Sequence, residues 1–306
     1  MASSERQPRK RKRGGTDAGG GGHSSEDSEA AEERAEHHYM LRKGDEFDTG
    51  RYVVTQQLGK GTFGRVVEMW DTHEQRAVAV KVVRAVEKYA REAEIEADII
   101  HELQRSLPSK RFPIVVLHRT FESRGHYCLA FEKMGPSLLS ALKGVRAAAA
   151  ATAEPVATGS AGSSHAPPPE RARSGPSSHF SLGQIAAIAM DCFEALAHIH
   201  SIQLTHTDLK PENILFTTAL EQSGAIPQQP QVALIDFGGA TWKHEHHSTI
   251  VCTRQYRPPE VTLGLDWSHP VDCWSMGCIL VELWTGTLLF STHDEVEQME
   301  EGADLP

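Results

Sequence analysis

The sequence has few of the features that mark secreted or membrane proteins. Its five cysteines are scattered and form no Cys-x-x-Cys pair, which argues against a disulfide framework and a structural zinc site. No uncharged apolar run reaches the roughly 20 residues of a membrane span, and the longest candidate, residues 278–290, is interrupted by Glu282. The first residues are basic and polar rather than an apolar signal. These absences predict a reduced, intracellular protein and exclude secreted, membrane and collagen-like classes.

Apolar residues are also scarce. They make up 39% of the 306 residues, whereas a compact globular chain has roughly 45–50%. Part of the chain is therefore predicted not to fold. The formal net charge of −10 at pH 7 disfavours nonspecific binding to nucleic acid. Neither nucleic acid nor a membrane is thus expected as a direct partner.

The first 48 residues are predicted to form a disordered tail, because they contain almost nothing apolar to bury. Residues 1–13 carry six basic residues and one acid, whereas residues 14–48 carry three basic residues and ten acids. The basic run is typical of a nuclear localisation signal. A solvated basic tail is the alternative, so the nucleus is the expected location and the cytoplasm a second one.

Residues 49–142 are predicted to form a small β-rich lobe. They contain β-branched runs separated by glycines, followed by a charged helical pattern at 87–104 with Ile95, Ile99 and Leu103 on one face. The predicted strands are residues 52–58, 65–70, 77–83, 114–117 and 127–131.

Residues 179–306 are predicted to form a helical lobe that begins with an Ala/Ile-rich helix at 182–200. Between the lobes, residues 143–178 contain five consecutive alanines, a Pro triplet and many Ser and Gly. No periodic apolar face exists there, so this segment is predicted to be a disordered surface insertion. Strands followed by helices predict an α+β fold.

The segment Gly59-Lys60-Gly61-Thr62-Phe63-Gly64-Arg65-Val66 fits the pattern G-x-G-x-x-G-x-V. Glycines let backbone N–H groups approach phosphate oxygens without Cβ clashes. Alone, the pattern would also fit a hairpin turn, and a dinucleotide-binding fold would need a helix directly after it. A strand follows instead, and it contains Val78-Ala79-Val80-Lys81, whose lysine can reach the α- and β-phosphates. From the residues alone, the acid that holds Lys81 could be Glu92, Glu94 or Glu96.

Residues 206–213, His-Thr-Asp-Leu-Lys-Pro-Glu-Asn, match the catalytic loop of protein kinases except at Thr207, where most kinases have Arg. Asp208 would accept or orient the proton of the attacking hydroxyl, and Lys210 would neutralise charge on the transferred phosphate. Asn213 would bind the second Mg²⁺ and Asp236, in Asp-Phe-Gly, the metal bridging the β- and γ-phosphates. With no Arg at 207 to receive a phosphate, the activation loop is predicted to be held by its own packing and hydrogen bonds.

Within the protein kinases, the sequence resembles the LAMMER-type, or CDC-like, dual-specificity family. The similarity is carried by residues 205–215, 245–249 and 253–274. The resemblance implies a two-lobed protein-kinase fold and selects Glu96 as the partner of Lys81. It also implies a hinge at Phe131-Glu132-Lys133-Met134-Gly135, with Phe131 as gatekeeper and backbone groups of Glu132 and Met134 binding adenine.

The family further implies phosphorylation of Ser, Thr and autophosphorylated Tyr, with Arg/Ser-rich splicing factors as protein substrates, and a monomer is expected. The expected cofactors are ATP and Mg²⁺, with Asn213 and Asp236 as metal ligands and Asp208 and Lys210 as catalytic residues. The predicted ATP-binding residues are Leu58, Gly59, Lys60, Gly61, Thr62, Phe63, Gly64, Val66, Ala79, Lys81, Glu96, Glu132 and Met134.

Some positions depart from the family. Pro258 stands where the family has Ala, and residues 296–302 keep only fragments of the motif that names the family. The chain stops soon after a predicted helix at 271–284, so the end of the helical lobe is predicted to be missing. Glu260 would then lack its arginine partner, at a cost of about 3–5 kcal/mol if it were buried. A catalytically inactive, kinase-derived binding module is therefore the alternative to an enzyme. A histidine group at 244–247 is not expected to bind metal, since carboxylate and cysteine partners are absent at ligand spacing.

Overall fold

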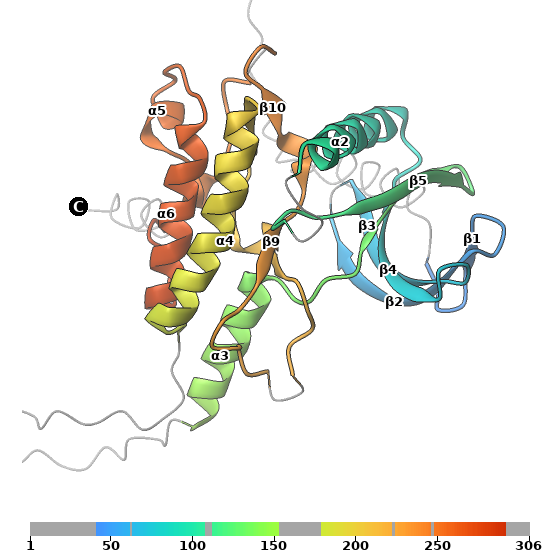
Figure 1. The fold of residues 1–306 in the computed structure, drawn as a ribbon, viewed down its shortest axis with the longest axis horizontal. Coiled ribbons are helices and arrows are strands. Elements are labelled where there is room, and N and C mark those ends of the chain that lie inside the picture. Colours follow the sequence, from blue (N-terminus) through green and yellow to red (C-terminus); the bar gives the residue numbers. More distant parts are fainter. Residues whose placement is uncertain are drawn as a thin grey trace, which may run out of the picture. The chain divides into compact units, whose positions relative to one another are not determined.

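The computed structural model describes residues 41–61, 63–107, 112–152, 179–221, 224–245 and 248–291 (Figure 1). Its first part is a six-stranded antiparallel sheet in the order β1-β2-β3-β4-β6-β5. The strands are β1 (Glu46–Phe47), β2 (Tyr52–Lys60), β3 (Gly64–Asp71), β4 (Arg76–Val83), β5 (Leu117–Ser123) and β6 (His126–Glu132).

Strand β4 shows why these residues form a sheet. Val78, Val80 and Val82 are buried and alternate with the half-buried Ala79 and Lys81, which is the two-residue period of a strand with unequal faces. Lys81 lies opposite Val66 of β3 and Leu129 of β6, so it has a neighbouring strand on both sides. This register fixes the lysine backbone firmly within the sheet.

Helix α2 (Glu87–Ser106) packs against the sheet (Figure 1). Its buried face contains Ile99, Ile100 and Leu103 together with the carboxylate-bearing Glu96. Ile95 was predicted to share the apolar face, but 59% of its surface is exposed. Position 95 is turned to solvent because the neighbouring position 96 is directed inward toward Lys81.

The second part is mainly helical. Figure 1 shows α4 and α6 side by side, and these two helices are in contact. Two short antiparallel strand pairs, β7 with β10 and β8 with β9, connect this part to the loops described below. The elements are α3 (Leu138–Thr152), α4 (Leu182–Ser201), β7 (Leu204–Thr205), η1 (Pro211–Asn213), β8 (Ile214–Phe216), β9 (Val232–Leu234), η2 (Phe237–Gly239), β10 (Thr241–Trp242), η3 (Arg254–Tyr256), α5 (Pro259–Thr262) and α6 (Pro270–Thr285).

Helix α4 is the central helix of this second part. Its N-terminus is closed by a capping box between Ser181 and Gln184, and its buried face includes Ile188, Leu196 and Ile199. By length and composition alone, α4 is apolar enough to cross a membrane. Here that apolar face belongs to the shared core with α2, α6 and the strands, so the hydrophobicity of α4 is explained by packing.

Two predicted segment boundaries differ from the structure. The tail was predicted to extend to residue 48, but β1 pairs with β2 and Phe47 is only 1% exposed. The insertion was predicted to begin at residue 143, but α3 continues to Thr152 through Ala147–Ala151. Alanine has the highest intrinsic helix propensity, so this run extends the helix without needing an apolar partner. Residues 1–40 and 153–178 lie outside the described residues.

Candidate active site

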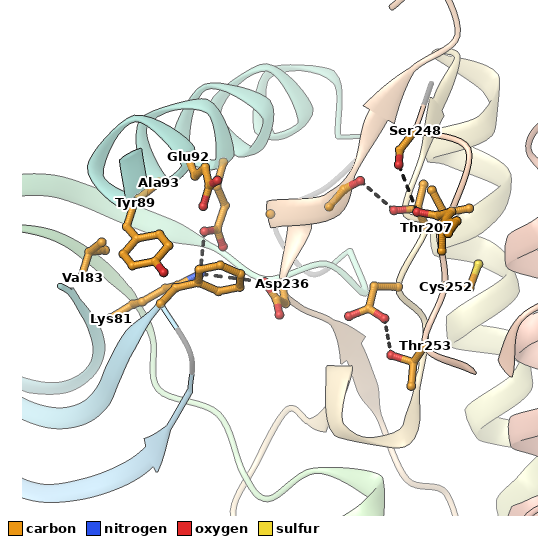
Figure 2. Close-up of a pocket in the computed structure, with 17 residues that line it drawn as sticks. Lys81, Val83, Tyr89, Glu92, Ala93, Thr207, Asp236, Ser248, Cys252 and Thr253 are labelled. Atoms are coloured by element: carbon orange, nitrogen blue, oxygen red, sulfur yellow. Dashed lines mark hydrogen bonds and ion pairs between the residues drawn. The ribbon is translucent and has the colours of Figure 1, made fainter. Parts of the chain in front are cut away.

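The predicted phosphate-binding lysine is held by two carboxylates. Lys81 Nζ lies 2.7 Å from Glu96 Oε2 and 3.9 Å from Asp236 Oδ1. The three side chains come from β4, from α2 and from the segment just before η2, and Figure 2 shows the lysine directed toward Asp236. Of the other two candidate acids, Glu92 is half-buried beside the same space and Glu94 is exposed.

Burial and charge compete at this triad. Burial alone would lower the pKa of Lys81, but attraction to Glu96 and Asp236 outweighs it and raises the pKa above its ordinary value. Lys81 is therefore a cation at neutral pH. Burial raises the pKa of Glu96, and the nearby ammonium group opposes that effect. The result is a fixed positive charge whose position depends on both the sheet and α2.

The glycine-rich segment is a tight turn between β2 and β3. The Gly61 N–H donates to the Gly64 carbonyl over 2.9 Å. A Cβ on Gly64 would lie 2.3 Å from the Val82 carbonyl oxygen, so no larger residue fits there. Leu58, near the end of β2, is 42% exposed, and Phe63, on the turn, is 50% exposed. Thr62 lies outside the described residues.

The predicted catalytic loop runs from β7 to η1 and surrounds Asp208 with hydrogen bonds. Lys210 Nζ donates to Asp208 Oδ2 over 2.6 Å, and Asn213 Nδ2 donates to the Asp208 carbonyl over 2.8 Å. The Thr253 hydroxyl donates to Asp208 Oδ1 over 2.6 Å (Figure 2). The three residues predicted from the sequence are thus brought together. The contact between Thr253 and Asp208 was not predicted, because two residues 45 positions apart give no local signal of it.

Asp272 of α6 binds the backbone of this loop and was not predicted as a functional residue. Its carboxylate accepts the backbone N–H groups of His206 and Thr207, each over 2.9 Å. His200 Nε2 lies 2.8 Å from the same carboxylate. The side chain is fully buried, so these partners satisfy an acid that would otherwise be costly to bury. The only signal in the sequence was an acid near the start of an apolar helix.

Three non-glycine residues around the site have left-handed backbones. Thr207, Asp236 and Cys252 have φ values of 67°, 63° and 64°. This conformation is unfavourable for residues with a Cβ, so the surrounding contacts must hold it. The Thr207 hydroxyl donates to the Gly239 carbonyl over 2.6 Å, and the Cys252 N–H donates to the Thr207 carbonyl over 2.9 Å. Thr207 therefore links the catalytic loop to Gly239 and Cys252, two points of the activation segment between Asp236 and Glu260.

Residues of the glycine-rich turn, β4, α2, the catalytic loop and the activation segment line a cavity of about 450 Å³ (Figure 2). Five predicted site residues line it: Phe63, Lys81, Glu96, Asp208 and Asp236. Lys210 and Asn213 contact Asp208 but do not line the cavity. The other predicted nucleotide-binding residues do not line the cavity. They lie on β2, on the turn, on β3, on β4, and at or just after the end of β6: Leu58, Gly59, Lys60, Gly61, Gly64, Val66, Ala79, Glu132 and Met134. The cavity therefore corresponds to the predicted phosphate-transfer region rather than to the adenine side.

The donors near the cavity suit a hard divalent cation. The Asp236 side chain is 44% exposed beside Lys81, and Asn213 uses its amide nitrogen toward Asp208, which leaves its oxygen as the group for a metal. Among the described residues, no cluster of three or more His, Cys, Asp or Glu side chains forms a preassembled site. Two oxygen ligands that are completed by phosphate oxygens fit Mg²⁺. His244 stacks with Trp242, whereas positions 246 and 247 lie outside the described residues.

Glu282 is buried, whereas Glu260 is not. Glu260 is half-buried in the first turn of α5, so the predicted cost of burying it without a partner does not arise. Glu282 of α6 is 5% exposed and accepts a hydrogen bond from the Tyr256 hydroxyl over 2.6 Å. Burial raises the pKa values of both groups.

Comparison with known proteins gives consistent matches. The sequence model of the protein kinase domain family matches residues 52–305. The chain is 37% identical to the serine/threonine-protein kinase AFC3 of Arabidopsis thaliana, over 82% of this chain and 58% of that protein. It is also 37% identical to the mouse (Mus musculus) dual specificity protein kinase CLK1, over 82% of this chain and 48% of that protein. The chain thus spans about half the length of these relatives.

A solved structure is also similar. The crystal structure of the PF14_0431 kinase domain matches with a TM-score of 0.67 at 33% sequence identity. The match covers 85% of this chain and 72% of that chain. The two-lobed α+β arrangement predicted from the sequence is therefore confirmed.

Proposed function

Because this chain belongs to the protein kinase family, we propose that it transfers the γ-phosphoryl group of ATP to Ser and Thr hydroxyls of proteins, and also to Tyr. One observation carries the proposal: the Lys81–Glu96 pair and Asp208 line the same cavity, and Lys210 contacts Asp208. The Lys81–Glu96 pair suits binding of phosphates, and the Asp208–Lys210 pair suits activation of a hydroxyl. Both are needed for phosphoryl transfer, and neither is needed for simple peptide binding.

Nucleotide binding would use the sheet side of the site. The Lys81 ammonium group would contact the α- and β-phosphates, and backbone N–H groups of the turn from Gly59 to Gly64 would cover them. Backbone groups of Glu132 and Met134 would hydrogen-bond adenine, as the family resemblance implies. Met134 is buried and lies two residues after the end of β6, whose register against β4 is fixed.

Metal binding would use Asp236 and the side-chain oxygen of Asn213. Mg²⁺, when bound, would neutralise the negative charge of the phosphates. Asp236 is also 3.9 Å from Lys81, so the same carboxylate would hold the metal and help to position the lysine. The left-handed backbone at Asp236 directs its side chain into the cavity.

Phosphoryl transfer would begin at Asp208. Its carboxylate would accept the proton of the substrate hydroxyl, while the hydroxyl oxygen forms a bond to the γ-phosphorus and the bond from that phosphorus to the bridging oxygen breaks. Lys210, 2.6 Å from Asp208, would stabilise charge on the transferred group. Thr253 donates to the other carboxylate oxygen and so fixes the orientation of Asp208.

The proposed substrates are basic, Arg/Ser-rich proteins such as splicing factors. Four of the cavity-lining side chains are acids, Glu92, Glu96, Asp208 and Asp236, and the chain carries a formal net charge of −10. A basic peptide is therefore favoured electrostatically over an acidic one. Peptides that contain Ser flanked by Arg should have a higher kcat/KM than matched peptides with Arg replaced by Gln. Equal values would contradict this substrate class.

A nuclear location and a monomeric state complete the proposal. The basic run at residues 6–13 supports nuclear import, although it lies outside the described residues. Replacing its six basic residues by Gln should shift a fluorescent fusion of the chain from the nucleus to the cytoplasm. Sedimentation of the purified chain should give a mass near 33.6 kDa if it is a monomer.

The alternative function is a kinase-derived binding module without catalytic activity. A thermal melt of residues 1–306 with and without Mg-ATP separates the two, since a ligand that binds only the folded state raises the midpoint. The enzyme should show a raised midpoint together with phosphoryl transfer to a protein substrate. A raised midpoint without transfer would favour the binding module, and the absence of a cooperative transition would contradict an enzyme in this chain.

A further inference from the structure

Tyr89 lines the same cavity but was not among the residues predicted for the site. It lies in the first turn of α2, and Figure 2 shows its ring directed from the helix toward Lys81. The Tyr89 ring meets the Phe63 ring edge-on, with centroids 5.5 Å apart and an angle of 75° between the planes. This is a favourable geometry for an aromatic pair. The contact joins the tip of the glycine-rich turn to α2.

Arg84 adds a second connection at the same place. Its backbone N–H donates to the Phe63 carbonyl over 3.0 Å, and its guanidinium carbon lies 5.4 Å from the Tyr89 ring centroid. A guanidinium at that distance is attracted to an aromatic ring. Arg84 is 8% exposed and directly follows β4, so the sheet and its burial fix the position from which it makes both contacts. We call Phe63, Arg84 and Tyr89 the aromatic clasp.

We propose that Tyr89 is a positioning residue that holds the glycine-rich turn closed over the phosphates and couples its closure to α2. This inference rests on the proposed kinase function. Phe63 is half exposed, so its contact with Tyr89 buries little apolar surface and chiefly fixes where the turn lies. Tyr89 precedes Glu96 by seven residues, about two helical turns, so both side chains lie on the same side of α2.

Coupling follows from this placement. A movement of α2 that separates Glu96 from Lys81 would also withdraw the Tyr89 ring from Phe63. The turn would then lose the ring contact with Tyr89 and keep the hydrogen bond from the Arg84 N–H. Bound phosphates would lose both the correctly placed lysine and the backbone N–H donors of the turn. Closure of the turn and formation of the Lys81–Glu96 pair are therefore expected to occur together.

The contact itself is tested by hydrogen exchange in the nucleotide-free chain. Tyr89→Leu should raise the exchange rate of backbone amides in residues 59–66, and Tyr89→Phe, which keeps the ring, should not. Phe63→Leu breaks the same contact from its exposed side and serves if Tyr89→Leu fails to fold. Ile95→Ala, on the exposed face of the same helix, controls for a general effect on α2. Unchanged exchange in both Leu variants would overturn the clasp.

Kinetics test its role in the reaction. Tyr89→Leu should raise the KM for ATP about three- to tenfold, the range expected for loss of an aromatic pair, with a smaller change in kcat. Tyr89→Phe should restore the wild-type KM. A merely structural role would lower the folded fraction, so kcat would fall while KM stayed constant, and that result would overturn the proposal. In the Phe63→Leu background, adding Tyr89→Leu should have no further effect on KM.

The two levels of inference fail in different ways. A wild-type chain that binds no Mg-ATP would overturn the proposed function and with it the role of the clasp in nucleotide binding. A wild type that binds Mg-ATP and transfers phosphate, together with a Tyr89→Leu variant with unchanged exchange and KM, would overturn the clasp alone.

Discussion

The two sides of the cavity are positioned by different arrangements of contacts. On the sheet side, Lys81 is placed by charged partners, Glu96 and Asp236, that come from two other elements. On the loop side, Asp208 also has a charged partner, Lys210, but the preceding residues His206 and Thr207 are placed by hydrogen bonds of their backbone N–H groups to a buried carboxylate, Asp272. The Lys81–Glu96 bond joins two long side chains on separate elements, whereas the Asp272 bonds hold backbone N–H groups against a fully buried side chain. The sheet side is therefore the adjustable half of the site and the loop side is the fixed half.

The sharpest test of this division compares one acid from each side. Asp208→Asn should lower kcat by a factor of about 10² to 10⁴, because it removes the group that accepts the proton, while Mg-ATP affinity stays near normal. Asp236→Asn should weaken Mg-ATP binding as well, since it removes a metal ligand and a partner of Lys81. Steady-state kinetics and calorimetric titration with Mg-ATP measure the two quantities. Equal effects on nucleotide affinity would mean that the two roles have been exchanged.

The second test compares the supports of the two sides. Asp272→Asn places an amide NH₂ against the backbone N–H groups of His206 and Thr207 and leaves a buried donor unsatisfied, so the free energy of unfolding should fall by about 3 kcal/mol. Glu96→Gln should cost about 1 kcal/mol, because burial already disfavours the carboxylate and Asp236 remains near Lys81. Urea denaturation measures both. A larger loss for Glu96→Gln than for Asp272→Asn would break the comparison.

A third test concerns pH, through an ion pair elsewhere in the sheet. Burial alone would raise the pKa of Asp71, but hydrogen bonds from Arg51 and from the backbone N–H groups of Glu74 and His73 lower it to about 2. An unfolded Asp has a pKa of about 4. Between these values the unfolded chain binds more protons, so the stabilisation from Asp71 is complete above pH 4 and is lost as the pH falls toward 2.

Asp71→Asn should therefore lower the free energy of unfolding by about 2 kcal/mol at pH 6, with a deficit that shrinks as the pH falls below 4. Denaturant midpoints of both chains across this range measure the deficit. A deficit that is constant with pH would show that packing of Asp71, rather than its charge, stabilises the sheet.

The smallest effect is expected from removing phosphate from the activation segment. Thr207 cannot bind a phosphate as arginine does, and it instead hydrogen-bonds Gly239 and Cys252. Phosphatase treatment should therefore leave the initial rate on a peptide substrate within a factor of about ten, or 1.4 kcal/mol of transition-state stabilisation. A larger loss that returns after incubation with ATP would contradict the view that this side is held by its own hydrogen bonds.

Much of the site was accessible from the sequence, because its key residues lie in short motifs. The spacing of Asp208, Lys210 and Asn213 within six positions already constrains them to one loop, and the structure joins them by hydrogen bonds. Lys81 was identified from its place in a strand after the glycine-rich turn. The choice of Glu96 over Glu92 needed the family resemblance, since helical spacing alone places both acids on one face.

Other features were decided only by the tertiary structure. Thr253, Asp272 and Tyr89 act on residues that are 45, 65 and 26 positions away, and an isolated Thr, Asp or Tyr in a sequence carries no sign of such a partner. The apolar Ile95 is exposed and the charged Glu96 is buried, which is the reverse of the usual preference of these side chains. Burial of Glu96 is tolerated because the Lys81 cation lies next to it. The sequence determined which chemical groups are present and which of them are neighbours along the chain. Folding decided which distant groups satisfy their charges and hydrogen bonds, since those free energies depend on distances that no linear pattern records.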